Sequence, residues 1–312
     1  MHKYILKRLL YLIPVMIGVT FIIFSLMHLT PGDPARLILG EVATEEQIAE
    51  TRERMGLNDH MIVQYGRFMR QLIFGGEDGR LGRSFRTQRL ISDEIGRRFV
   101  PTLQLAAAGT LVSVILGIPI GIIAAIRQYS IFDNVTMVGA LLGLSMPLFW
   151  MALLMQRFFG VHLGWFPSMG WGSFQQMIMP AIAIGVGGAA IIARMTRSSM
   201  LEIIRQDYIR TAKAKGQKSS VIITDHALKN ALIPVITVIG LQFGFLLGGA
   251  VLTETVFAIP GIGTFMLEGI RTRDMPIVQG GVLVIAIAFC LVNLIVDVLY
   301  AFVDPRIKSQ YR

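Results

Sequence analysis

The chain has 312 residues, of which 54% are hydrophobic, and its formal net charge is +9. This hydrophobic share exceeds that of an ordinary soluble domain, so the composition predicts a membrane protein whose Lys and Arg gather on the cytoplasmic side. No motif for nucleic-acid binding accompanies the charge, and the single cysteine, Cys290, excludes an intramolecular disulfide. The five histidines form no H-E-x-x-H motif, so neither a metal site nor a catalytic residue is expected.

Six segments are long and apolar enough to span a bilayer as helices, which takes about 20 residues each. They are Leu9–Leu29, Leu103–Ile126, Val135–Phe159, Met177–Ala193, Ile233–Thr253 and Ile277–Tyr300. The first is longer than the core of a signal peptide and no A-x-A site follows it, so we expect an uncleaved helix. The fourth is the weakest, because it is short and the run GVGGAA lowers helix propensity. The sequence thus predicts an all-α membrane protein with six transmembrane helices.

The segment between the first two spans, residues 31–100, is expected to form a small extracytoplasmic subdomain, because long loops cross the membrane largely regardless of charge. Within it, Thr44–Leu57 begins with a capping Thr and early acids, which predicts a helix. The other predicted parts are a first transmembrane helix in residues 1–30, a five-helix core in residues 101–303 with a cytoplasmic segment at 194–233, and a cytoplasmic tail at 304–312.

The distribution of charge predicts which way the loops face. With six spans both termini share a side, and that side would carry eight Lys and Arg between Arg194 and Lys229 besides those near the termini. The two short loops of the opposite side, Gly160–Gln176 and Glu254–Pro276, contain only two arginines. The positive-inside rule therefore places both termini in the cytoplasm.

Glycines four residues apart mark three helix faces that other helices could approach closely. They are Gly117 and Gly121, Gly139 and Gly143, and Gly240, Gly244 and Gly248. Packing within the chain is the favoured interpretation. The alternative is a partner-subunit interface or a pore-lining face.

The basic segment between the fourth and fifth spans has the pattern helix, glycine, helix. An amphipathic helix is indicated by residues three or four positions apart, namely Leu201, Ile204, Tyr208 and Ala212. Gly216 is placed to end this helix in the left-handed conformation, and Ser219 or Ser220 can cap a second helix. Pro234 then falls in the first turn of the fifth span, where proline is tolerated.

Three interpretations of this basic segment compete. It could be a loop that merely touches anionic lipid, a phosphate-binding loop suggested by KGQKSS, or a rigid docking element for a cytoplasmic partner. The phosphate loop is rejected because the motif G-x-x-x-x-G-K-[ST] is missing and no strand precedes it.

A few polar residues in or near the last two spans are candidates for a translocation pathway. Gln242 and Asn293 lie among apolar residues, and polar groups inside spans are functional candidates by default. Asp297 lies near the cytoplasmic end of the sixth span, where a structural role is favoured.

A helix break is predicted after the fifth span, where Pro260 and Gly261 crowd together in the run FAIPGIG. It is either a surface turn or an outer gate or dock for another protein. Glu254 is the nearest charged residue.

Ordered motifs along nearly the whole chain resemble the dipeptide/oligopeptide/nickel/glutathione family of ABC importer permeases. The coupling segment (EAA region) of that family resembles DYIRTAKAKG, residues 207–216, followed by HALKNALIPV. Its first span resembles KRLLYLIPVMIGVTFIIFSLMHLTPGDPARL, and its fifth span and outer return resemble GLQFGFLLGGAVLTETVFAIPGIGTFMLEGIRTRDMPIVQG. The outer loop and the C-terminus VDVLYAFVDPRIK also match. The TPGDP turn and long outer loop are similar to the B-type subunit rather than its C-type partner.

The coupling segment departs from the general pattern E-A-A-x-x-x-G followed by I-x-L-P. Arg210, Thr211 and Ala212 occupy the E-A-A places, and Pro234 comes later than the general spacing allows. This departure is typical of the peptide-permease branch, and it restricts contacts carried over from the general pattern to the neighbourhood of Ala212 and Gly216.

The resemblance implies a type I ABC importer permease in the bacterial inner membrane, working by alternating access. It implies a C-type permease partner, two ATPase subunits that bind ATP and Mg²⁺, and an extracytoplasmic substrate-binding protein, while this chain binds no cofactor and hydrolyses no ATP. The segment coupled to the ATPase is expected to contain Tyr208, Ile209, Arg210, Thr211, Ala212, Ala214 and Gly216.

Two other classes are weaker. A stand-alone secondary transporter would show internal repeats, and a membrane enzyme would show a nucleophile or metal motif; the sequence has neither. The solute is expected to be a peptide, with nickel, glutathione or an oligosaccharide as alternatives within the family.

Overall fold

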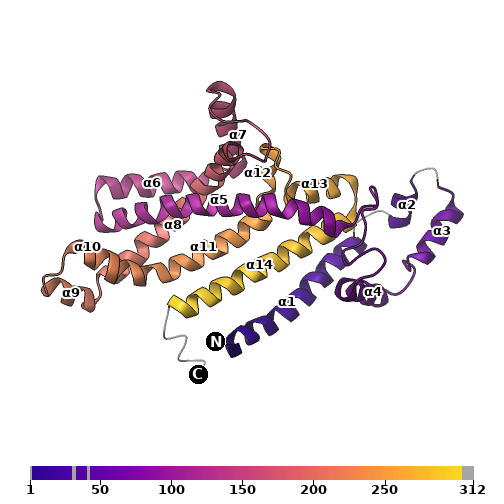
Figure 1. Cartoon of the computed structure of the whole chain (residues 1–312), viewed down its shortest axis with the longest axis horizontal. Helices are drawn as coiled ribbons and strands as arrows, with labels where there is room; N and C mark the ends of the chain where they lie inside the picture. Colours follow the sequence, from indigo (N-terminus) through magenta and orange to yellow (C-terminus); the bar gives the residue numbers. More distant parts are fainter. Residues whose placement is uncertain (1, 30–32, 41–42, 304–312) are drawn as a thin grey trace. The chain divides into compact units, whose positions relative to one another are not determined.

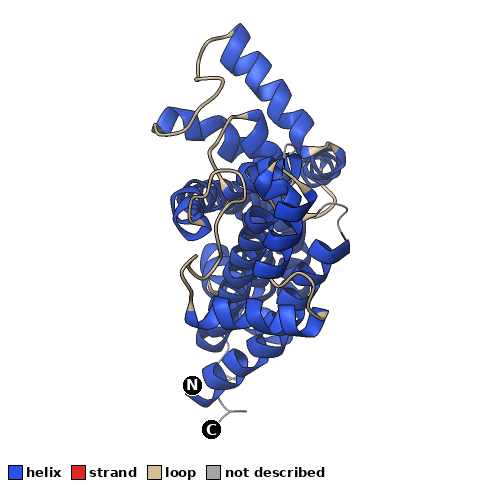
Figure 2. Ribbon diagram, turned by 90° about the vertical axis from the view of Figure 1, so that its right-hand side faces the viewer, coloured by secondary structure: helices blue, strands red, loops and turns tan. Residues whose placement is uncertain are grey.

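The computed structural model describes residues 2–29, 33–40 and 43–303, and their regular structure is helical (Figures 1 and 2). An isolated antiparallel bridge joins Arg83 to Leu90. The chain divides into two compact units, of which unit 1 comprises Met1–Arg8, Thr102–Ile259 and Phe289–Arg312, and unit 2 comprises Leu9–Pro101 and Pro260–Ala288. The predicted boundaries at residues 30, 100 and 303 refer to the membrane and stay a prediction. The predicted tail at 304–312 and the Thr30-Pro31-Gly32 part of the TPGDP turn lie outside the described residues.

Five helices are long and apolar enough to cross a membrane. They are α1 (His2–Leu29), α5 (Ile91–Ile126), α8 (Phe174–Ile204), α11 (Lys229–Gly249) and α14 (Met275–Val303). They confirm five of the six predicted spans, because an uninterrupted apolar run of this length is a property of the local sequence.

The third predicted span, Val135–Phe159, is not one straight helix. Helix α6 (Ile131–Ser145) meets the run formed by α7 (Leu148–Met155) and the π-helix η1 (Gln156–His162) at an angle of 98°. Pro147 causes the break, because it lacks a backbone N–H and drives the preceding residue out of the helical region; Met146 has φ −80° and ψ 124°. A sixth crossing exists only if this bent pair counts as one span.

The weakest predicted span lies in the most deeply buried helix. Of the most apolar window of α8, 61% is buried within the chain, against 17% for α14. Its glycines lower helix propensity, but they also remove side chains from a crowded surface. A Cβ added at Gly185 would lie 2.5 Å from Cγ1 of Val112 on α5. Tertiary packing therefore outweighs the local preference of GVGGAA.

The three predicted glycine faces differ in whether another helix packs against them. A Cβ at Gly117 would lie 2.8 Å from the carbonyl oxygen of Ala189, and one at Gly121 would lie 2.6 Å from that of Ala193, so α5 and α8 touch at backbone level. Gly244 likewise lies against Phe289 of α14. By contrast, nothing lies within 4 Å of a Cβ built on Gly139 or Gly143. Packing within the chain is confirmed for the first face and for Gly240 and Gly244 of the third, while Gly248 is exposed; the α6 face has no partner among the described residues.

Unit 2 contains the loop between the first two spans, folded as α2 (Pro34–Leu39), α3 (Glu45–Arg54) and α4 (Met61–Phe74). The predicted helix after Thr44 is confirmed, because Thr44 and Gln47 form a reciprocal capping box at the start of α3. Aromatic residues of α4 pack on α1, where the hydroxyl of Tyr65 lies 3.0 Å from that of Thr20.

A buried carboxylate fixes the turn that precedes α5 in unit 2. Asp274, between α13 (Ile262–Thr272) and α14, accepts hydrogen bonds from the hydroxyl of Ser84 at 2.5 Å and from the backbone N–H groups of Phe85 and Arg86. Both Asp274 and Ser84 are almost fully buried. Beside them, Ile91 and Phe265 belong to an apolar core that joins α5, α13 and α14.

Candidate functional site

The basic segment of unit 1 is helical, but its elements differ from the predicted ones. Helix α8 ends at Ile204, Gln206 takes an extended conformation, and α9 (Asp207–Ala214) begins directly afterwards. Leu201 and Ile204 therefore belong to α8, and the single helix predicted from Leu201 to Ala212 is wrong. Figure 1 shows α9 beside the end of α8, followed by α10 (Ser219–Val221) and the π-helix η2 (Ile222–Leu228).

Gly216 ends α9 as predicted. Its φ is +72°, in the left-handed region that favours glycine. The N–H of Gly216 donates to the carbonyl of Lys213, and the N–H of Gln217 donates to that of Ala212, which is the bonding pattern of a Schellman motif. The helix thus has a sharply defined end.

Two predictions for the second half of the basic segment are wrong. Lys218 is the N-cap of α10 and makes no side-chain cap, so neither Ser219 nor Ser220 caps this helix as predicted. Helix then continues through η2 into α11, and Pro234 lies inside α11 rather than in a first turn. The second error arises because η2 continues into α11, so the fifth span has no separate first turn near Pro234.

One face of α9 is buried in a cluster of small and apolar residues. Ile209 is fully buried and Ala212 is 9% exposed. They pack with Ala125 of α5, Met200 of α8, Ile222 and Ala227 of η2, and Ala231 of α11. The inner face of α9 therefore rests on the ends of three candidate spanning helices.

Polar contacts hold α9 against the following helices. Asn230 donates from Nδ2 to the hydroxyl of Tyr208 at 3.0 Å and to the carbonyl of His226 at 2.9 Å. Nε2 of His226 lies 2.8 Å from Oε1 of Gln217. These bonds fix the angle of α9, because they join it to both η2 and α11.

The outer face of α9 is exposed and basic. Of the seven predicted coupling residues, Tyr208, Arg210, Thr211, Ala214 and Gly216 are exposed, whereas Ile209 and Ala212 face inward. Further exposed cations on this surface are Lys213, Lys215 and Lys218. The seven residues thus lie together in one element, with an anchoring side and an accessible side.

Gln242 bridges three helices. It lies on α11, passes over Gly188 of α8 and donates from Nε2 to the hydroxyl of Ser113 on α5 at 3.3 Å. The hydroxyl of Ser113 in turn donates to the carbonyl of Gly185. The pathway role predicted for Gln242 stays a prediction, and the contacts give the residue a structural task.

Glu254 and Asn293 are engaged in separate contacts. Glu254, in α12 (Val251–Val256), is fully buried and accepts a hydrogen bond from the hydroxyl of Thr102 at 2.6 Å. Asn293 donates from Nδ2 to the carbonyl of Phe289 one turn earlier in α14. Neither contact brings these residues to Gln242 or to α9.

The helix break predicted at Pro260 and Gly261 is confirmed, because α12 ends at Val256 and α13 begins at Ile262. Gly261 is buried and Pro260 is exposed. The chain passes from unit 1 to unit 2 between Ile259 and Pro260. A gate or docking role for this turn stays a prediction.

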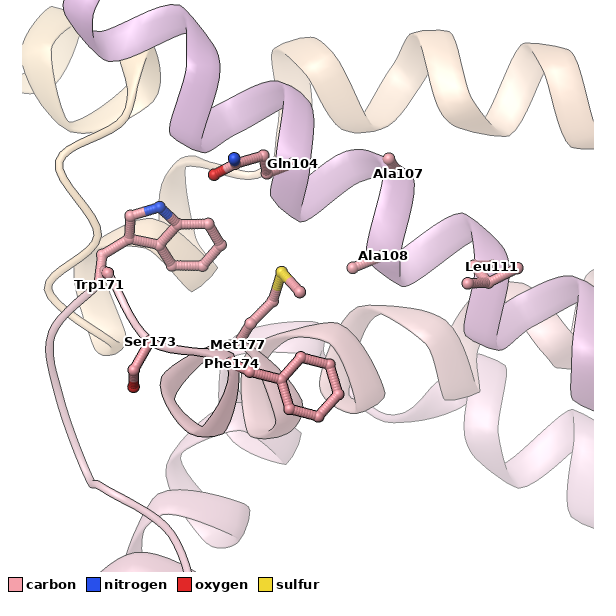
Figure 3. A pocket seen from close by; sticks show the side chains of 9 residues that line it. Gln104, Ala107, Ala108, Leu111, Trp171, Ser173, Phe174 and Met177 are labelled. Atoms are coloured by element: carbon pink, nitrogen blue, oxygen red, sulfur yellow. The ribbon is translucent and has the colours of Figure 1, made fainter.

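A cavity of about 530 Å³ lies between α5 and the loop that leads into α8. Its lining consists of Gln104, Ala107, Ala108, Leu111, Trp171, Gly172, Ser173, Phe174 and Met177. Figure 3 shows Gln104 and Trp171 facing the same space, with Met177 reaching from α8 toward α5. The lining contains one carboxamide and two aromatic rings but no charged side chain, so it suits a ligand with amide groups and apolar surface.

This cavity was not predicted from the sequence. Its usable signal was Gln104 in an apolar run, one turn before the small pair Ala107 and Ala108. Trp171 is contributed by a loop, and its approach to α5 depends on contacts that no local pattern encodes.

Comparison with known proteins gives matches along nearly the whole chain. The family model described as binding-protein-dependent transport system inner membrane component matches residues 117–309, and the model of its N-terminal part matches residues 1–106. A dipeptide transport system permease protein, DppB of Alkalihalophilus pseudofirmus, is 48% identical over 99% of this chain and 100% of the relative. A glutathione transport system permease protein, GsiC of Salmonella paratyphi A, is 42% identical over 99% of each chain.

A solved structure shares the fold. The inward-facing MetNI methionine ABC transporter aligns with a TM-score of 0.59 at 20% identity, over 69% of this chain and 98% of that chain. At this identity the likeness concerns the arrangement of the helices alone.

Proposed function

Because this chain belongs to the binding-protein-dependent transport system inner membrane component family, we propose that it forms half of the translocation pathway of a peptide importer. It is a multi-pass inner-membrane ABC importer permease, close to dipeptide and glutathione permeases. The solute proposed is a dipeptide or a similarly short peptide. ATP hydrolysis is assigned to partner chains, which would bind ATP and Mg²⁺.

The construction of α9 supports this function most directly. A coupling element must be stiff, must be anchored to the moving helices and must offer a surface to its partner. Helix α9 has a defined end at Gly216, rests through Ile209 and Ala212 on α5, α8 and α11, and exposes a basic outer face. Movement of an ATPase subunit bound to that face would therefore reach three spanning helices at once.

The orientation follows from the same assignment. The ATPase subunits act in the cytoplasm, so α9 and both termini are placed there, in agreement with the excess of Lys and Arg on that side. The partners proposed are a second permease of the C type, two ATPase subunits and an extracytoplasmic binding protein that delivers the solute. The loop in unit 2 then lies on the extracytoplasmic side.

The cavity beside Gln104 supports a solute with peptide groups. A carboxamide can both donate to and accept from a peptide bond, and Trp171 and Phe174 offer apolar surface to a side chain. Its volume of about 530 Å³ lies within the range of small-molecule sites. We propose that this cavity contacts the solute during passage.

Uptake by reconstituted complexes tests the function. The chain is co-purified with its second permease and ATPase subunits, placed in proteoliposomes, and supplied with binding protein loaded with labelled dipeptide or glutathione. We expect ATP-dependent dipeptide uptake that needs every component. Uptake by this chain alone would identify a secondary transporter instead, and uptake of glutathione without dipeptide would overturn the proposed solute.

A further inference from the structure

A bidentate ion pair links α6 to α8 in unit 1. Nε of Arg197 lies 2.6 Å from Oδ1 of Asp133, and Nη2 of Arg197 lies 2.7 Å from Oδ2. The side chain of Asp133 is 2% exposed and that of Arg197 is 22% exposed. Two parallel bonds between a guanidinium and a carboxylate fix the orientation of both groups, which a single point-charge contact does not.

Asp133 is also built into the start of α6. The hydroxyl of Ser130 accepts the N–H of Asp133 as the helix cap, and Oδ2 of Asp133 accepts the N–H of Tyr129 at 2.9 Å. The carboxylate therefore holds the turn between α5 and α6 as well as Arg197. A displacement of Arg197 would act on the first turn of α6 through a satisfied, buried network.

Arg197 stands close to the coupling cluster along α8. Met200, three residues further on, is fully buried in the cluster that anchors α9. On the other side of Arg197, Ala193 and Thr196 lie directly against Gly121 of α5. The ion pair thus sits where α8 carries both the coupling helix and a rigid contact to α5.

Helix α6 packs on α8, while much of the rest of its surface is exposed. Val135, Val138 and Leu142 are more than half exposed, and Gly139 and Gly143 have open space around them. Asp133 is almost fully buried, so removing Arg197 would leave an uncompensated buried charge, and the geometry of the intact pair is held firmly.

We propose that Arg197 and Asp133 are positioning residues that make α6 follow the movement of α9. This inference rests on the proposed function, because it requires α9 to receive movement from an ATPase. With the pair intact, α8 transmits a shift of the coupling cluster to the first turn of α6. With the pair broken, α9 still responds to ATP while α6 does not follow it.

Transport and ATP hydrolysis by the reconstituted complex test the proposal. Arg197→Gln is expected to keep ATP hydrolysis but lower the solute imported per ATP by about tenfold, an ordinary size for coupling between sites. Arg197→Lys should restore part of the ratio, because it keeps the charge without the fork. Arg194→Gln, at an exposed arginine one turn earlier on α8, serves as the matched control and should import normally.

The double variant Asp133→Asn with Arg197→Gln separates coupling from folding. It leaves no unpaired buried charge, so it should assemble even where Arg197→Gln does not. A reduced import ratio in the double variant supports the proposal. A normal number of solute molecules imported per ATP, in Arg197→Gln or in the double variant, overturns the proposal. If the wild-type complex itself imports no peptide, the proposed function has failed instead.

The distance between α6 and α10, which follows α9, provides a second measurement, one that a purely structural role of the ion pair would not change. In a Cys290→Ala chain, spin labels are placed at Leu142 on α6 and Ser220 on α10, both exposed. With Arg197 present, we expect the nucleotide-free and the vanadate-trapped complexes to give the same distance distribution. With Arg197→Gln, we expect the two complexes to give different distributions. A distance that changes with nucleotide in the wild-type pair would overturn the proposal.

Discussion

Gly188 shows how a single missing side chain shapes the interior of unit 1. The carboxamide of Gln242 occupies the space that a Cβ would fill and so reaches Ser113 on α5. From the sequence, Gln242 could be identified as a polar residue in a span. Its partner could not, because Ser113 lies 129 residues away and Gly188 looks like any other glycine.

Gly188→Ala should therefore destabilise the protein. The added methyl displaces Gln242, and overpacking of this kind costs about 1–3 kcal/mol. Thermal unfolding of the purified protein in detergent measures the effect. Gly187→Ala is the matched control, because a Cβ at the neighbouring position meets nothing within 4 Å. Equal melting temperatures for the two variants would contradict the close approach of Gln242.

At the scale of the element, α9 combines what the sequence predicted with what it could not. The end at Gly216 was predictable, because a glycine after a helical pattern is a local signal. The break at Gln206 was missed, since apolar spacing continues through it from Leu201 to Ala212. The opposite error occurs at the fifth span, where helix runs from η2 into α11 without the predicted new start.

Gly216→Pro should separate ATP hydrolysis from uptake in the reconstituted complex. Proline cannot adopt a φ of +72° and has no N–H to donate to Lys213, so α9 loses its end. Ala212→Glu should act in the same direction by forcing a charge into the anchoring cluster. Uptake and ATP hydrolysis are both recorded.

Gly216→Asn controls for the loss of glycine itself, because asparagine tolerates the left-handed region. It should import at near wild-type rates. Normal uptake by Gly216→Pro and Ala212→Glu would remove the coupling role from α9.

At the scale of the whole molecule, the positions of five spans could be predicted from the sequence, because apolar length is a local property of the chain. Pro147 was visible in the third span, but the 98° angle depends on how α7 packs. The division into two units was also beyond the sequence. Each unit joins segments far apart in the chain, such as Leu9–Pro101 with Pro260–Ala288.

The orientation of the molecule can be read by chemical labelling. In a Cys290→Ala chain, Thr87→Cys in unit 2 and Ser220→Cys beside α9 each place one exposed thiol. A membrane-impermeant maleimide should label Thr87→Cys in intact spheroplasts and Ser220→Cys only after lysis. The reverse pattern would invert the proposed topology.

The carboxylate of Asp274 also has a consequence for biosynthesis. It orders the turn at Ser84, yet it is added to the chain 190 residues later. At the roughly 5–20 residues per second of translation, this delay is about 10–40 s. During that interval the N–H groups of Phe85 and Arg86 and the hydroxyl of Ser84 lack this acceptor and bond to water instead. The turn at Ser84 is made early, but it is completed only after Asp274 has been added to the chain.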